Sequence, residues 1–204
     1  MASKPTSTAG YAEQSSALFE RYEAVDPAKL YAWLTPDFPE APADVIDIGA
    51  GTGRDAGWLA NLGHRVVAVE PVPELREGAR LLHSHPHIRW VDDHLPHLSN
   101  LGDLTFDLIL LSAVWMHFDR EERAASMATL ARLARPHACL GLSLRHGPIP
   151  EGRRMFDVSK AETIELATTY GFRHFVFHST DQPGRDHRQP GVTWTRLGFR
   201  FGER

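Results

Sequence analysis

The 204-residue chain has little cysteine and no long apolar run. Its one cysteine, Cys139, cannot form a disulfide within the chain, which is typical of a reducing compartment. No apolar stretch approaches the roughly 20 residues that cross a bilayer. The N-terminal stretch MASKPTSTAGYAEQSS lacks the apolar segment of a signal peptide. These absences favour a cytoplasmic protein that does not span a membrane.

The chain also lacks a strong charge of either sign. It has 22 Lys and Arg residues against 26 Asp and Glu residues, so its net charge is −4. Binding to the phosphates of a nucleic acid requires several clustered cations, so nucleic acid is an unlikely partner. The composition, 42% hydrophobic and 24% charged, is that of an ordinary globular protein, and the length favours a single domain over residues 1–204.

Apolar runs and helical patterns alternate from residue 44 onward, which predicts an α/β fold with a mostly parallel sheet and right-handed crossovers. Strands are predicted at 44–48, 65–70, 88–91, 106–111, 138–144, 172–178 and 192–200, and helices at 54–62, 73–84, 119–134 and 159–170. The last two strands are joined only by the turn-rich stretch TDQPGRDHRQPG, so they are expected to form an antiparallel hairpin at the edge of the sheet. Gly63 and Gly171 each follow a helical pattern, where a left-handed cap favours glycine.

The N-terminal region differs in character from this core. Residues 1–10 are small and polar, and we expect a disordered, frayed end. The pattern from Tyr11 to about Leu34 is helical, and Asp26-Pro27 divides it into two helices. Residues 11–40 are therefore predicted to form an N-terminal helical cap on a core that spans 44–204.

The stretch VIDIGAGTGR, residues 45–54, predicts a strand that runs into a glycine-rich turn. In a doubly wound sheet such a turn lies beyond the carboxyl ends of the strands, where ligands bind. The glycine spacing is GxGxG, whereas the dinucleotide pattern GxGxxG would place its third glycine at position 54, which is Arg54. The spacing disfavours a nicotinamide oxidoreductase.

Acidic residues stand at the ends of the first three predicted strands: Asp47, Glu70, Asp92 and Asp93. Glu70 lies 21 residues after Gly49, a separation that suits an acid bound to a ribose diol. Several carboxylates around one pocket would repel a diphosphate. They favour a ligand with positive charge, a diol and an adenine amino group, and S-adenosylmethionine (SAM) has these features and no phosphate.

VIDIGAGTGR, VVAVEP, the acids before Leu95-Pro96, and FDLILLSAVWMHF together resemble the successive motifs of class I SAM-dependent methyltransferases. The resemblance covers about residues 44–144. It implies a Rossmann-like seven-stranded sheet of order 3-2-1-4-5-7-6 with the last strand antiparallel, and S-adenosylhomocysteine (SAH) as the product. One departure is visible, because the Pro-Gly-Gly turn usual before the fifth strand is Arg135-Pro-His-Ala138 here.

The resemblance also implies the roles of cofactor-binding residues. Asp47 and Gly49 would contact the methionine end, Gly51 would allow close approach of the backbone, and Glu70 would bind the ribose hydroxyls. Asp92 or Asp93 would meet the adenine, and which of the two does so stays open. The predicted cofactor-binding set is Asp47, Gly49, Ala50, Gly51, Arg54, Glu70, Pro71, Asp92, Asp93, Ser112 and Ala113.

The segment after the fourth predicted strand, 112–118, is expected to lie beside the transferred methyl group. His117 titrates in the range of a catalytic base, but a histidine at this position also packs beneath the cofactor in the family, and both roles stay open. Trp115 is predicted to line the substrate pocket.

A second group of candidates surrounds the expected pocket mouth. Arg145, at a strand end, would suit a carboxylate or phosphate on the substrate, with His146 beside it. Arg153 and Arg154 are better explained by ion pairs with Glu151 and Asp157 or by simple exposure to water. Weaker candidates for the same rim are Arg185 and Trp194, and Tyr11 and Tyr22 either form a lid or belong to the core.

The predicted function is methyl transfer from SAM to an oxygen, nitrogen or sulfur atom of a small molecule. Alternatives are a protein or nucleic-acid target and a SAM-binding sensor without chemistry; no NPPY-like motif for base methylation follows the fourth strand. The histidines between 83 and 97 form no compact ligand motif, so no metal site is predicted. Whether the protein is a monomer or a homodimer stays open.

Overall fold

The computed structural model describes residues 6–180 and 191–202. Within them, seven strands form one sheet in the order β3-β2-β1-β4-β5-β7-β6. The strands are β1 Asp44–Ile48, β2 Arg65–Val69, β3 Ile88–Val91, β4 Phe106–Leu111, β5 Ala134–His146, β6 Phe172–Thr180 and β7 Thr193–Phe201. Strands β1 to β5 pair in parallel, and β7 is antiparallel to both β5 and β6. The predicted fold class, strand order and edge hairpin are confirmed.

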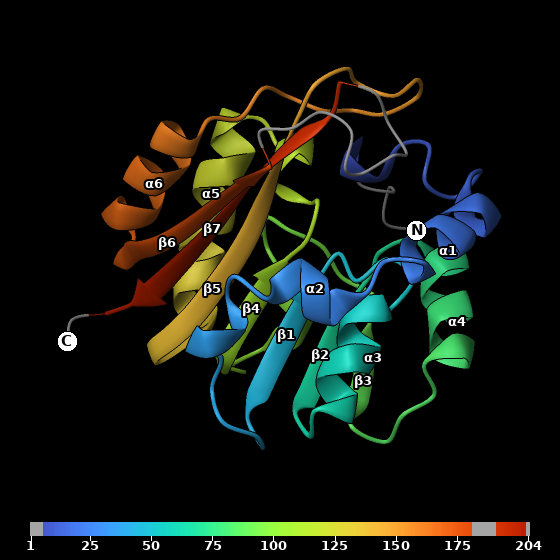
Figure 1. Ribbon diagram of the computed structural model, residues 1–204, viewed down its shortest axis with the longest axis horizontal. Helices are drawn as coiled ribbons and strands as arrows, with labels where there is room; N and C mark the ends of the chain where they lie inside the picture. The colour runs from blue at the N-terminus through green and yellow to red at the C-terminus, as the bar shows by residue number, and fades with distance from the viewer. Residues whose placement is uncertain (1–5, 181–190, 203–204) are drawn as a thin grey trace.

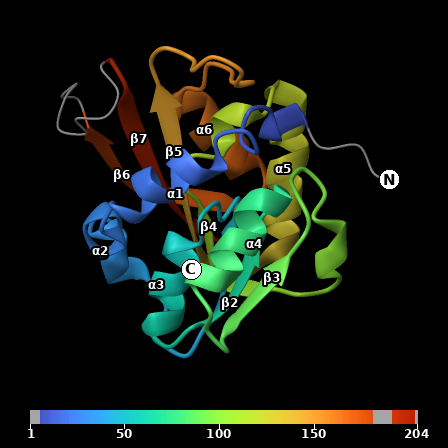
Figure 2. The ribbon, with the colours of Figure 1, turned by 90° about the vertical axis from the view of Figure 1, so that its right-hand side faces the viewer.

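Helices cover both faces of this sheet, with α5 and α6 on one face and α2 and α3 on the other (Figures 1 and 2). The α-helices are α1 Ser15–Glu23, α2 Pro27–Tyr31, α3 Arg54–Asn61, α4 Pro73–Leu82, α5 Arg120–Leu133 and α6 Lys160–Thr169. Short 3-10 helices are η1 Thr6–Thr8, η2 Thr35–Asp37, η3 Ser99–Leu101 and η4 Trp115–His117. Gly63 and Gly171 have φ values of 95° and 86°, as expected for left-handed caps after α3 and α6.

The central strands are apolar on both faces because helices cover both. On β4, Ile109 and Leu111 belong to the core beneath α5 and α6, whereas Leu108 and Leu110 belong to the core beneath α2 and α3. A continuous apolar run is the pattern of a strand buried on both sides. Packing on both faces fixes where the parallel strands end. The residues that follow them therefore lie together at one edge of the sheet.

The N-terminal segment follows the prediction in part. Asp26-Pro27 does divide two helices, because Pro27 is the first residue of α2 and the Asp26 side chain accepts a hydrogen bond from Ala28 N at 3.0 Å. Helix α1 begins at Ser15, so the prediction that helix starts at Tyr11 is wrong; Gly10 has a φ of 75°, outside the helical region. Of the stretch expected to be frayed, Thr6–Thr8 form a 3-10 helix, and residues 1–5 lie outside the described residues.

The departure from the family turn before the fifth strand becomes a bulge. Strand β5 begins at Ala134, immediately after α5, and not at 138 as predicted. Its pairing with β4 shifts between Phe106 and Leu108, and His137 takes a positive φ of 67°. Residues 135–137 are thus absorbed as extra residues in the strand.

Two kinds of feature are absent from the described residues. No helix there has the length and apolar character needed to cross a bilayer. No group of three or more His, Cys, Asp or Glu side chains in that part of the chain is placed to hold a metal ion.

Candidate cofactor and acceptor site

Two adjoining cavities lie at the carboxyl ends of the central strands, beneath the N-terminal segment. The larger cavity has a volume of about 230 Å³ and the smaller about 100 Å³. The residues that line both are Tyr11, Tyr22, Gly49, Gly51, Ser112 and Ala113. Because the walls are shared, one elongated ligand can extend from the smaller cavity into the larger.

The glycine loop between β1 and α3 forms the floor where the cavities meet. Backbone N–H groups of Gly49 and Ala50 both donate to the Val69 carbonyl, at 2.8 and 2.9 Å, which ties the loop to the end of β2. Gly49 has a φ of 71°, and a Cβ there would lie 2.6 Å from Val114 Cγ2. Only glycine fits both the backbone conformation and the space.

Glu70 follows β2 and lines the smaller cavity. Its Oε2 accepts from Gly51 N and its Oε1 from Val72 N, both at 2.8 Å. Burial raises the pKa of Glu70 to about 7, although these two hydrogen bonds favour the ionised form. Each carboxylate oxygen keeps a further lone pair, so Glu70 can still accept hydrogen bonds from a diol.

Asp47 lies within β1 and lines the larger cavity. It is 1% exposed, and in the described part of the chain its Oδ2 has no hydrogen-bond partner. Burial raises the pKa of Asp47 well above its ordinary value, and the neighbouring Asp55 raises it further. An unsatisfied buried carboxylate is costly, and a cationic group in the cavity would relieve that cost.

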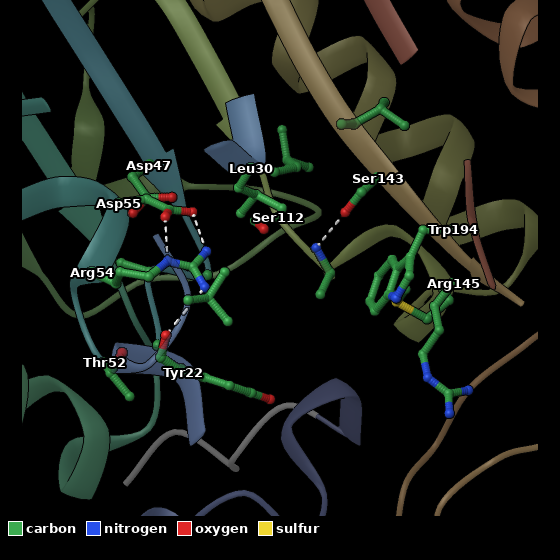
Figure 3. Close-up of a pocket in the computed structure, with 18 of the residues that line it drawn as sticks. Tyr22, Leu30, Asp47, Thr52, Arg54, Asp55, Ser112, Ser143, Arg145 and Trp194 are labelled. Carbon is green, nitrogen blue, oxygen red and sulfur yellow. Dashed lines mark hydrogen bonds and ion pairs between the residues drawn. The ribbon is translucent and has the colours of Figure 1, made fainter. Parts of the chain in front are cut away.

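Arg54 lies beside Asp47 but is held by other groups (Figure 3). Its Nε and Nη2 donate to the two oxygens of Asp55 at 2.7 and 3.0 Å, and its Nη1 donates to the Tyr22 carbonyl at 3.4 Å. Tyr31 Oη donates to Asp55 Oδ2 at 2.7 Å. The charge of Arg54 is therefore balanced by Asp55, a residue that sequence reasoning did not single out.

The predicted adenine contacts are only partly supported. Asp92 is a largely exposed side chain that pairs with Arg76 Nη2 at 3.1 Å, and Asp93 accepts from the backbone N–H groups of His94 and Asn100. Neither aspartate lines either of the two cavities: the Asp92 side chain is paired with Arg76 on α4, and Asp93 fixes the turn after β3. A contact of either residue with adenine stays a prediction.

Other residues line the smaller cavity. Pro71, a predicted cofactor-binding residue, lines it together with Val72 from the start of α4. His94 and Leu95, which follow the two aspartates in the chain, line it as well. In the sequence, only their position directly after the two acids pointed to these residues, because an uncharged cavity wall produces no recognisable charge pattern.

The segment after β4 contributes backbone and not the expected aromatic wall. Ser112 and Ala113 line both cavities as predicted, and Ala113 N donates to Ser143 Oγ at 2.8 Å. Trp115 is completely buried in the core and lines neither cavity, so its predicted role is corrected. The 3-10 helix η4 turns Trp115 inward and leaves Met116 at the larger cavity.

His117 is paired with Tyr11 above it. Its Nδ1 lies 2.8 Å from the Arg154 carbonyl, which can only accept, so Nδ1 is the donor. Burial lowers the pKa of His117, so the ring is neutral and Nε2 accepts from Tyr11 Oη at 3.0 Å. His117 lines the smaller cavity, and the lone pair of its Nε2 is directed at the hydroxyl group of Tyr11.

A contact between distant parts of the chain covers this pair. The Arg153 guanidinium carbon lies 3.4 Å from the centre of the Tyr11 ring, and its Nη atoms donate to Ala9 O at 3.3 Å and Gln14 Oε1 at 2.8 Å. The loop 147–158 is thereby fastened to the N-terminal segment. The lid role of Tyr11 and Tyr22 stays a prediction, with both rings now placed in the cavity walls.

The remaining rim candidates divide into two groups. Arg145 and Trp194 line the larger cavity and are register partners on β5 and β7. His146 does not line it; its Nε2 lies 3.0 Å from Thr195 Oγ1. Arg154 pairs with Asp119 and Glu122 at 3.1 and 2.8 Å, as the structural alternative foresaw but with different acids. Arg185 lies outside the described residues.

The family model for a methyltransferase domain matches residues 46–141, the part that carries the glycine loop, Glu70 and the segment after β4. This part of the chain is similar to a methyltransferase domain. The predicted resemblance is therefore confirmed, and the fold and the sequence motifs agree on the same ligand edge of the sheet.

Similar proteins are known both from sequence and from solved structures. An uncharacterized methyltransferase of Mycobacterium tuberculosis is 32% identical over 125 residues, which are 61% of this chain and 47% of that protein. Cypemycin N-terminal methyltransferase of Streptomyces sp is 32% identical over 114 residues, 53% of this chain and 44% of that protein. The chain thus spans about half the length of the curated relatives it matches.

A solved structure shows the same fold over nearly the whole chain. The 1,6-didemethyltoxoflavin-N1-methyltransferase of Burkholderia thailandensis, with 1,6-didemethyltoxoflavin and SAH bound, superposes with a TM-score of 0.69. The identity is 20%, and the match covers 94% of this chain and 87% of that one. At this identity the likeness concerns the fold alone.

Proposed function

We propose that this protein transfers a methyl group from SAM to an oxygen, nitrogen or sulfur atom of a small molecule. The observation that carries the proposal is the pair of joined cavities, with the buried carboxylate of Glu70 at one end and the unsatisfied Oδ2 of Asp47 in the other. Their spacing along β1 and β2 suits a ligand that has a diol at one end and a cation at the other.

The chain's own residues fit the binding of SAM, which when bound supplies a methyl group on a sulfonium sulfur. Glu70 accepts from the ribose hydroxyls, and the walls formed by Val72 and Leu95 hold the adenine. Asp47 receives the ammonium group, and the glycine loop lets the ligand pass close to the backbone between them. A cation at Asp47 also offsets the desolvation that raises its pKa.

The acceptor is placed at the junction of the cavities, where Tyr11 belongs to both walls. Displacement at a methyl carbon requires a nucleophile held about 3–3.5 Å away, and the sulfur leaves without needing an acid. The protein must still take the proton of an O–H or N–H acceptor. Tyr11 Oη, bonded to the neutral His117 Nε2, gives that proton a path, and the Arg153 contact keeps bulk water from the junction.

The test has a binding arm and a turnover arm. Calorimetry with SAH is expected to give one site per chain with Kd in the micromolar range or tighter, roughly −8 kcal/mol or better. Incubation with SAM and fractions of small hydroxyl, amine and thiol compounds is expected to release SAH. Binding without turnover in any fraction would favour a sensor, and absence of SAH binding would contradict both.

A second candidate is methylation of a peptide amine. It is favoured by the similarity to a relative whose name states that it acts on the N-terminus of cypemycin. The same SAH-release assay with short peptides that have free amino termini distinguishes the two candidates. Faster turnover of peptides than of small amines would replace the first candidate with the second.

A further inference from the structure

The two ends of the larger cavity differ in charge. Among the described residues that line it, the acids are Asp47 and Asp55, both at the glycine-loop end. The arginines that line it are Arg21, Arg54, Arg145, Arg153 and Arg196. Arg145 and Trp194 lie across the cavity from Asp47 and Asp55 in Figure 3. The end of the larger cavity that lies away from Asp47 and Asp55 is therefore positively charged.

Not all of these arginines are equally placed to bind a ligand. Arg54 is balanced by its bidentate contact with Asp55, and Arg153 is occupied by Tyr11, Ala9 and Gln14. Three arginines are left: Arg21 on α1, Arg145 at the end of β5 and Arg196 on β7. Arg21 lies near enough to lower the pKa of Arg145, so these two form a pair of neighbouring cations at the cavity. Both make further contacts within the chain, so an incoming anion meets side chains that are already ordered.

The surroundings of Arg145 favour an anion. Burial lowers the pKa of its guanidinium, and the nearby Arg21 lowers it further, whereas Tyr11 and Tyr22 raise it. A partly buried cation beside a second cation is stabilised by a carboxylate or phosphate, which a guanidinium binds through two parallel hydrogen bonds. The repulsion between the Arg145 and Arg21 guanidinium groups is therefore relieved when an anion binds beside them.

Apolar side chains make up much of the remaining wall of the larger cavity. They include Val25 and Leu30 from the α1–α2 region, Trp33, and Trp194, the register partner of Arg145. The same cavity, about 230 Å³, must also hold the methionine end of the cofactor, so the space left suits a body about the size of a single ring.

We propose that the methyl acceptor is a small molecule with an apolar body and a carboxylate or phosphate group, which Arg145 binds together with Arg21. The inference rests on the proposed function and states its substrate class. With the anion at Arg145, the nucleophilic atom of the acceptor lies toward Tyr11, at the junction with the smaller cavity.

The test uses three probes that share a ring and differ in charge. Benzoate, phenyl phosphate and the neutral benzamide are titrated calorimetrically into wild-type protein saturated with SAH. At least one anion is expected to bind about tenfold or more tightly than benzamide, and the better of the two identifies the anionic group. Equal binding of all three, or binding of none, would overturn the proposal.

Substitutions of single arginines test which side chains cause the preference for the anion. Arg145→Gln is expected to abolish the preference for the anion, Arg21→Gln to reduce it, and both are expected to keep the wild-type affinity for SAH, which shows that they fold. Arg89→Gln, an exposed arginine on β3, is the matched control and should keep the preference. A preference that survives in Arg145→Gln would also overturn the proposal.

Failure of the proposed function can be distinguished from failure of the anion site. If SAH does not bind to the wild-type protein, the proposed function is contradicted. Benzoate and benzamide would then be compared on the protein without SAH, where a preference for benzoate lost in Arg145→Gln would still support the anion site, and equal binding would overturn it.

Discussion

At the scale of single residues, two buried carboxylates define the site. Glu70 already accepts two backbone hydrogen bonds, whereas Asp47 leaves one oxygen without a partner in the described part of the chain. In both, burial raises the pKa, so each is more easily ionised when a ligand supplies a donor or a cation. Substitutions of Glu70 and of Asp47 are therefore predicted to have different effects.

Glu70 makes SAH binding depend on pH. Its pKa in the empty protein is about 7, and a ribose diol donates best to the ionised form, so binding below pH 7 requires loss of a proton. The affinity should fall by up to about tenfold per pH unit below 7 and change little above it. Calorimetry from pH 5.5 to 8 measures this, and Glu70→Gln should bind more weakly with a shallower slope. An identical slope in Glu70→Gln would assign the titration to another group.

Asp47→Asn separates stability from binding. Because the raised pKa of Asp47 means that the empty fold favours its neutral form, a neutral amide should leave the free energy of unfolding unchanged or higher. Loss of the charge should weaken SAH binding about tenfold or more. Thermal unfolding and calorimetry on the same variant test both parts. A large loss of stability would show that the carboxylate is structurally required.

At the scale of elements, the loop between β1 and α3 is constrained in three ways at once. It must turn with positive φ, contact β2 through Val69, and leave no side chain between the cavity and Val114. Glycine meets all three conditions, and no other residue does.

Gly49→Ala tests these conditions against a control with the same backbone. Gly202 also has a positive φ, 81°, but a Cβ there would meet nothing within 4 Å. Gly202→Ala should cost about 1 kcal/mol, from the left-handed backbone alone. Gly49→Ala adds the clash with Val114 and should cost roughly 2–4 kcal/mol and abolish SAH binding. Equal unfolding midpoints in urea for the two variants would show that the contact with Val114 is easily relieved.

The elements also show what the sequence could predict. Strands buried on both faces, such as β4, give a continuous apolar run, and glycine caps such as Gly171 mark helix ends, so the topology was predictable. Trp115 was misplaced because a single 3-10 turn reverses the direction of a side chain and leaves no periodic signal. The roles of Asp92 and Asp93 could not be told apart, because an acid that caps a turn and an acid that binds a ligand look the same in sequence.

At the scale of the whole molecule, Cys139 reports on global unfolding. It lies on β5 in the core beneath α2 and α3 and is completely buried, and burial raises the pKa of its thiol to about 12. A neutral, inaccessible thiol is unreactive, since the thiolate is the nucleophile.

Ellman's reagent should therefore modify Cys139 stoichiometrically in denaturant and only slowly in the native protein. Because the proposed SAH site exists only in the folded state, SAH should slow the native reaction by about the factor 1 + [SAH]/Kd when opening is in rapid equilibrium. Absorbance at several SAH concentrations measures the rate. Fast native modification, or a rate indifferent to SAH, would show that the thiol is exposed by a local motion away from the ligand.

The contact of Arg153 with the Tyr11 ring has a kinetic consequence. Tyr11 stands in the walls of both cavities, and Arg153, distant from it in sequence, holds it there. A movement that lifts this ring would open both cavities together. Under the proposed function, the spent cofactor and the methylated product would then share one exit, and the rate at which they leave would depend on the stacking of one guanidinium on one phenol.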